Sequence, residues 1–96
     1  MNVVEHMMEL YREGIDELMG AERYAKKAKK ATGSEEKVMY HNMAKQELGH
    51  AHELMKDGDS LFSGADAMDS LHMVWKSLRD HLCTWKKSIE AMLTDP

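Results

Sequence analysis

A carboxylate and an imidazole lie three positions apart at Glu47 and His50, near the middle of the chain. On a helix, this spacing places both side chains on adjacent turns of one face. Carboxylate oxygens and imidazole nitrogens are ligands of divalent metals such as iron, manganese and zinc. Because Glu-x-x-His also arises by chance, the pair predicts a metal site only if both residues face a core and another carboxylate approaches them.

Glu22 is the candidate for that further carboxylate, because it interrupts an apolar series in the first part of the chain. The series has alternating spacings of four and three residues and comprises Val4, Met8, Tyr11, Ile15, Leu18, Glu22 and Ala25. Such spacing predicts an amphipathic helix, about residues 3–31, whose apolar seam packs against another helix. An ionised carboxylate in a dry seam is strongly unfavourable unless it is paired or binds a cation.

A second helix is predicted over about residues 35–56, with Glu47 and His50 in its seam. That seam reads Tyr40, Met43, Glu47, His50 and Leu54, and a competing apolar stripe comprises Ala44, Leu48, Ala51 and Met55. Tyr40 is expected to be either a core tyrosine or a hydrogen-bond partner of a metal ligand.

A short break at residues 32–34 predicts that the two helices form an antiparallel hairpin. Gly33 suits a left-handed helix cap and Ser34 suits the next N-cap. The midpoint between Glu22 and Glu47 falls at the boundary of residues 34 and 35, so both carboxylates are expected within about one helical turn of the same height. The sequence therefore predicts a metal site formed by Glu22, Glu47 and His50.

A third helix is predicted over about residues 66–93, after a polar loop at residues 57–60. Its heptad pattern comprises Met68, Leu71, Trp75, Leu78, Leu82, Trp85, Ile89 and Met92. This seam holds no carboxylate, so the helix is expected to serve packing or assembly. One hairpin supplies half of the ligands of a two-metal site in a four-helix bundle, and a two-fold dimer supplies the full set. We therefore expect at least a homodimer, with a larger ring of dimers as an alternative.

Composition agrees with a single all-α domain over residues 1–96. The chain has ten Met, one Pro and only six aromatic residues of the Phe, Trp and Tyr types, a balance that disfavours a sheet-rich fold. It contains no apolar run of membrane-spanning length, and its net charge of −4 gives no reason to expect nucleic acid as a partner. A single Cys fits a reducing, cytoplasmic setting.

Two segments, DELMGAERYA at residues 16–25 and MAKQELGHA at residues 43–51, resemble the ferritin-like superfamily. The resemblance covers residues 8–56 and is closest to half-ferritins such as encapsulated ferritin, in which one hairpin dimerises to rebuild a four-helix ferroxidase. It implies binding of two Fe(II) ions and their oxidation by dioxygen. It also implies that Glu22 is the ligand from the first helix, Glu47 the bridging carboxylate and His50 the terminal ligand.

The end of the chain departs from the encapsulated ferritins, which carry a targeting peptide with a Gly-Ser-Leu core. This chain ends AMLTDP at residues 91–96. Packaging in an encapsulin shell is therefore not expected, and a location inside a protein compartment is kept as an alternative to the open cytoplasm.

Three functions follow from these patterns. The first is a di-iron ferroxidase of ferritin-like type, with manganese or zinc as alternative metals because the same ligands accept them. The second is a non-catalytic helical assembly module with a structural metal such as zinc or calcium, or with none. The third is an apolar interaction protein that binds partners through its third helix.

Overall fold

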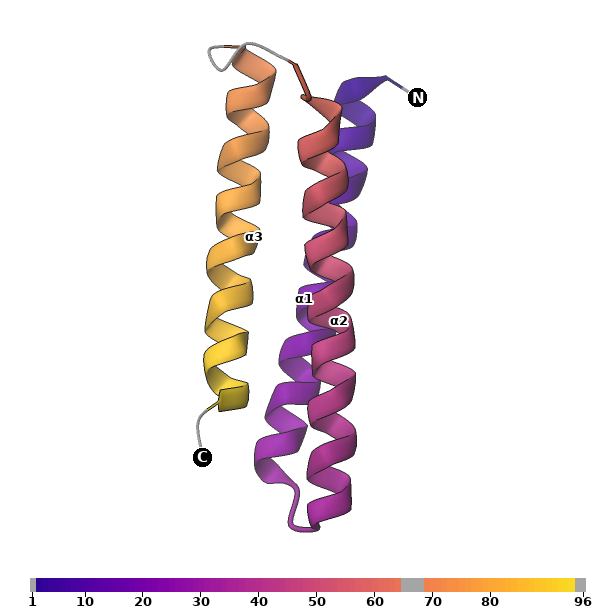
Figure 1. The fold of residues 1–96 in the computed structure, drawn as a ribbon, viewed down its shortest axis with the longest axis vertical. Coiled ribbons are helices and arrows are strands. Elements are labelled where there is room, and N and C mark those ends of the chain that lie inside the picture. The colour runs from indigo at the N-terminus through magenta and orange to yellow at the C-terminus, as the bar shows by residue number, and fades with distance from the viewer. Residues whose placement is uncertain (1, 65–68, 95–96) are drawn as a thin grey trace.

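Three long helices make up the computed structural model, which describes residues 2–64 and 69–94 (Figure 1). Helix α1 spans Val3–Lys30, α2 spans Ser34–Leu61 and α3 spans Ser70–Thr94. Within these two described segments there is no strand. The prediction of an all-α fold with three helices is thus confirmed, while the dimeric four-helix bundle stays a prediction.

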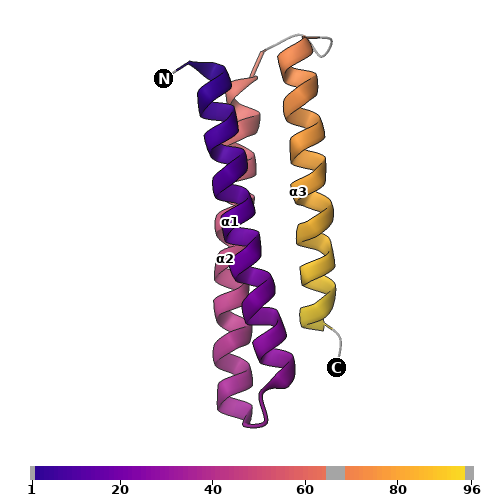
Figure 2. The same ribbon diagram turned by 180° about the vertical axis from the view of Figure 1, so that it is seen from behind.

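Successive helices alternate in direction along an elongated molecule of 50 × 24 × 16 Å, with α1 running down, α2 up and α3 down in the view of Figure 1. Helices α1 and α2 form the expected antiparallel hairpin and pack along their length, whereas α3 lies beside them and packs mainly on α1 (Figures 1 and 2). None of the helices, as far as they are described, has an apolar stretch long enough to cross a bilayer.

The ends of the hairpin helices follow local chemistry. The side-chain oxygen of Asn2 accepts a hydrogen bond from the Glu5 backbone N–H at 2.8 Å and caps the start of α1. The turn differs from its prediction, because Gly33 is the N-cap of α2 with φ −88° and Ser34 is the first helical residue. Ala31 and Gly33 both adopt extended backbone, and no residue of this turn has a positive φ, so the chain reverses here without a left-handed residue.

The hairpin core consists of small residues and leucines. The α2 stripe that is buried comprises Ala44, Leu48, Ala51 and Met55, and it packs on Leu18, Ala21 and Ala25 of α1. The predicted α2 seam from Tyr40 to Leu54 is therefore wrong, and the competing stripe forms the core. Alanines explain this outcome, because they let two helices approach closely and leave the longer polar side chains at the edge of the interface.

The predicted apolar series of α1 is correct only in part, whereas the heptad pattern of α3 is confirmed for the residues that the structure describes. The residues of α1 that are buried are Met7, Leu10, Gly14, Leu18, Gly20, Ala21 and Ala25. Val4 is instead 49% exposed. In α3, the heptad residues Trp75, Leu82 and Ile89 are all buried. Met68 of the predicted heptad lies outside the described residues.

Helix α2 continues to Leu61 through residues 57–60, where the sequence predicts a polar loop. The Asp59 carboxylate accepts hydrogen bonds from Trp75 Nε1 at 2.9 Å and from Arg79 Nε at 3.0 Å. Gly58 lies against the Trp75 ring, at a distance that leaves no room for a Cβ. These contacts with α3 stabilise the last turn of α2 and outweigh the local preference of an Asp-Gly-Asp-Ser segment for a loop.

Candidate metal centre

Two carboxylates and an imidazole converge on the outer edge of the α1–α2 interface. One ligand atom from each of Glu17, Glu47 and His50 lies within 4.8 Å of the others. His50 Nδ1 is 3.4 Å from Glu17 Oε2 and 4.0 Å from Glu47 Oε1. The side chains of Glu17 and Glu47 are 29% and 28% exposed, and that of His50 is 63% exposed. The cluster is therefore half-buried at its base and open to solvent at His50.

The hairpin geometry places these residues at one height. Glu17 and Glu47 are each fifteen residues from Thr32 in the turn, and both lie near the middle of their helices. Gly20 makes room for the second carboxylate, because a Cβ built on it would lie 2.8 Å from Glu47 Oε2. The Glu47 side chain can thus lie across α1 without meeting a side chain at that position.

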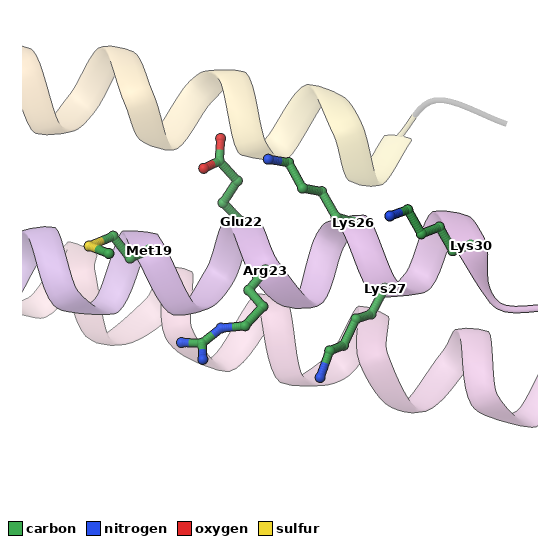
Figure 3. Close-up of a pocket in the computed structure, with 6 residues that line it drawn as sticks. All are labelled: Met19, Glu22, Arg23, Lys26, Lys27 and Lys30. Carbon is green, nitrogen blue, oxygen red and sulfur yellow. The ribbon is translucent and has the colours of Figure 1, made fainter.

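Glu22 lies on a different side of α1. Figure 3 shows its carboxylate pointing toward α3, while Arg23 and Lys27 point toward the α2 side. Five residues of helix correspond to a rotation of about 140° from Glu17, so the two glutamates of α1 cannot face the same neighbour. The structure therefore brings together Glu47 and His50 of the predicted set, and Glu17 rather than Glu22 joins them.

Glu17 is the residue that sequence reasoning missed. The position of the turn could have identified Glu17, because it determines which residue of α1 lies at the height of Glu47. The chain reverses around Thr32 and not at the boundary of residues 34 and 35. A turn centred on Thr32 matches Glu47 with Glu17, whereas Glu22 is only ten residues from it. Sequence reasoning selects Glu22 instead because it interrupts the predicted apolar series of α1, and a midpoint at residues 34 and 35 is close enough to the turn to agree with that choice.

Tyr40 stacks on Tyr24 across the same edge of the interface. Their ring centroids are 6.3 Å apart with an interplanar angle of 19°, and Lys27 Nζ lies 5.5 Å from the Tyr40 centroid. Each tyrosine is seven residues, or about 10 Å of helix, from the glutamate on its own helix. Within one chain, Tyr40 therefore belongs to an aromatic pair next to the cluster.

The environment of Glu47 disfavours its charge. Burial raises the pKa of Glu47, and the hydrogen bond and negative charge of Glu17 raise it further, whereas the charges of His50 and Arg23 lower it. A cation between the two carboxylates would relieve this repulsion. Two carboxylate oxygens with one imidazole nitrogen suit divalent iron, manganese and zinc, so the donor set fits a transition metal.

Comparisons with known proteins identify no relative of this chain. No protein-family model matches the sequence, and no curated protein or solved structure shows a significant match to the chain. The ferritin-like resemblance of residues 8–56 therefore stays a prediction.

Glu47→Gln should stabilise the metal-free protein at neutral pH. Because the pKa of Glu47 is raised on folding, its charge destabilises the folded state once the pH rises through that pKa, and the effect is absent below the ordinary carboxyl pKa. We expect a gain of roughly 0.5 kcal/mol at pH 7.5, typical of partly exposed charges, that disappears near pH 4. Urea unfolding with a chelator present measures the free energy of unfolding at both pH values.

Glu53→Gln is the matched control for this experiment. Glu53 also lies on α2, but its side chain is 66% exposed and lies 3.9 Å from Lys56 Nζ. Its replacement should give no gain at pH 7.5. An equal gain for Glu47→Gln at both pH values would show that removing charge from Glu47 is not the cause.

Proposed function

We propose that this chain is a metal-binding protein of ferritin-like type that binds Fe(II) through Glu17, Glu47 and His50 and oxidises it with dioxygen. The supporting observation is the convergence of three ligand atoms from two helices within 4.8 Å at the edge of the α1–α2 interface. The sequence resemblance points to the same chemistry, with Glu17 in place of Glu22.

A second copy of the hairpin would complete the site. The cluster lies at the middle of α1 and α2, on the edge of the hairpin that α3 does not cover. A two-fold axis through the cluster and perpendicular to the helices would align two hairpins antiparallel over their full length. It would also double the ligands to four carboxylates and two imidazoles, the set that binds two metals in four-helix bundles.

The charge distribution along α1 supports this antiparallel pairing. Acidic residues predominate from the start to the middle of the helix, where Arg12 is the one Lys or Arg, and they are Glu5, Glu9, Glu13, Asp16 and Glu17. Basic residues occupy its end, namely Arg23, Lys26, Lys27, Lys29 and Lys30. Two antiparallel copies would place the acidic half of each helix beside the basic end of the other, an arrangement that favours this orientation over a parallel one.

The residues of the chain have distinct roles in the proposed reaction. Glu17 and Glu47 would neutralise the charge of the bound cations, and Glu47 would release any proton that it shares with Glu17. His50 would supply a neutral nitrogen ligand from the solvent side. Fe(II) is the substrate: each of two ions loses one electron, and dioxygen accepts both electrons with two protons to give hydrogen peroxide.

Anaerobic addition of Fe(II) to metal-free protein tests this function. We expect the sedimenting species to change from the 11.0 kDa monomer to a dimer that binds two iron ions. Admission of air should then produce ferric near-ultraviolet absorbance much faster than Fe(II) oxidises in buffer. Oxidation at the rate of buffer alone would refute the ferroxidase assignment.

A structural metal is the second candidate function. Three protein ligands with one open direction also match a zinc site, whose fourth ligand a partner chain could supply. In that case zinc would drive dimerisation as well as iron does, and iron oxidation would stay at the background rate.

A further inference from the structure

A groove of about 650 Å³ runs between α2 and α3 and faces away from the metal cluster. It exists because α3 packs mainly on α1 and leaves this side of α2 partly uncovered. Leu48 and Leu93 contribute apolar surface to its lining. Gly49 also lines the groove, and a Cβ built there would meet no atom within 4 Å, so a larger side chain at this position would project into open space.

The polar groups of the groove are mainly basic. Lys45 and His52 make no hydrogen bond or ion pair with any described residue. Glu90 supplies the only carboxylate among the described lining residues, and it already accepts a hydrogen bond from Lys86 Nζ at 3.2 Å. The groove therefore carries a local excess of positive charge in a chain whose net charge is −4. This excess favours an anionic ligand.

We propose that this groove binds a small amphipathic anion, an aliphatic carboxylate whose head group pairs with Lys45 and whose chain lies against Leu48 and Leu93. Its volume falls within the range of about 300–1,000 Å³ that is typical of small-molecule sites. Nine residues line it, whereas a stable protein interface uses about 20–30 residues from each partner. Its size therefore favours a small ligand over a partner helix.

Decanoate is the probe that tests the proposal, with the full chain and below the concentration at which decanoate forms micelles. Calorimetric titration should show saturable binding, with decylamine at least tenfold weaker because its head group carries the opposite charge. Lys45→Gln should weaken decanoate binding by about tenfold through loss of a charge-assisted hydrogen bond. Lys76→Gln, on α3 but outside the groove, should leave it unchanged.

Gly49→Leu should abolish decanoate binding by filling the groove, and its thermal unfolding shows whether the fold is kept. The Lys45 and Lys76 variants test the proposal independently of that result. Equal effects of the two lysine variants, or equal affinity for decylamine, would overturn it. Binding of an acidic helical peptide that decanoate cannot displace would overturn it in favour of a protein partner.

Discussion

Glu17→Ala should reduce the rate of Fe(II) oxidation by roughly a hundredfold or more. The expected size follows from metal sites in general, where loss of a group that only orients a ligand already costs about 10–100-fold in metal affinity. Glu17 would be a ligand itself, since its Oε2 atom lies 3.4 Å from His50 Nδ1 in the cluster. Ferric absorbance after aerobic addition of Fe(II) measures the rate, and calorimetry under nitrogen measures Fe(II) affinity.

Glu22→Ala is the matched control, because it removes the same side chain from the same helix at a similar degree of burial. Its carboxylate points toward α3, so the oxidation rate should stay within about twofold of the parent (Figure 3). The reverse result, with Glu22→Ala inactive and Glu17→Ala active, would favour the set predicted from sequence. Glu47→Ala and His50→Ala should be inactive in either case.

The fold could be predicted from sequence because each helix carries its own periodic pattern. The α3 heptad identifies Trp75, Leu82 and Ile89 correctly, since large apolar residues in one stripe have only one core to face. The buried stripe of α2 is less clear from sequence, because two apolar stripes compete. Alanines at Ala44 and Ala51 give a weak hydrophobic signal, yet both are buried in the hairpin core. Periodicity alone cannot show that close approach outweighs side-chain size.

The candidate site could be predicted only in part, for a geometric reason. Glu47 and His50 share a helix, so their spacing fixes their relation. The partner on α1 depends on the turn, where an error of two or three residues changes which side chain meets Glu47. Helical rotation then decides between the two glutamates, because Glu17 and Glu22 face directions about 140° apart. The backbone of the turn, which has no left-handed residue, was not evident from Gly33.

Gly58→Ala should destabilise the protein by about 1 kcal/mol, although alanine is the better helix former. Gly58 is buried in α2, and an added Cβ would overlap the ring of Trp75, which is 1% exposed. Overpacking of this kind costs about 1–3 kcal/mol, which outweighs the gain of roughly 1 kcal/mol from helix propensity. The ring cannot move freely, because its Nε1 donates to Asp59 at 2.9 Å.

Gly49→Ala separates packing from propensity, because it makes the same change in the same helix where a Cβ meets no atom within 4 Å. It should stabilise the protein by about 0.5–1 kcal/mol. Urea unfolding at one protein concentration, without metal, measures both variants, since ligand binding and association would alter the apparent stability. The two substitutions should therefore change the free energy of unfolding in opposite directions. If Gly58→Ala were as stabilising as Gly49→Ala, the Trp75 ring could not lie against Gly58, and the contact that extends α2 to Leu61 would be refuted.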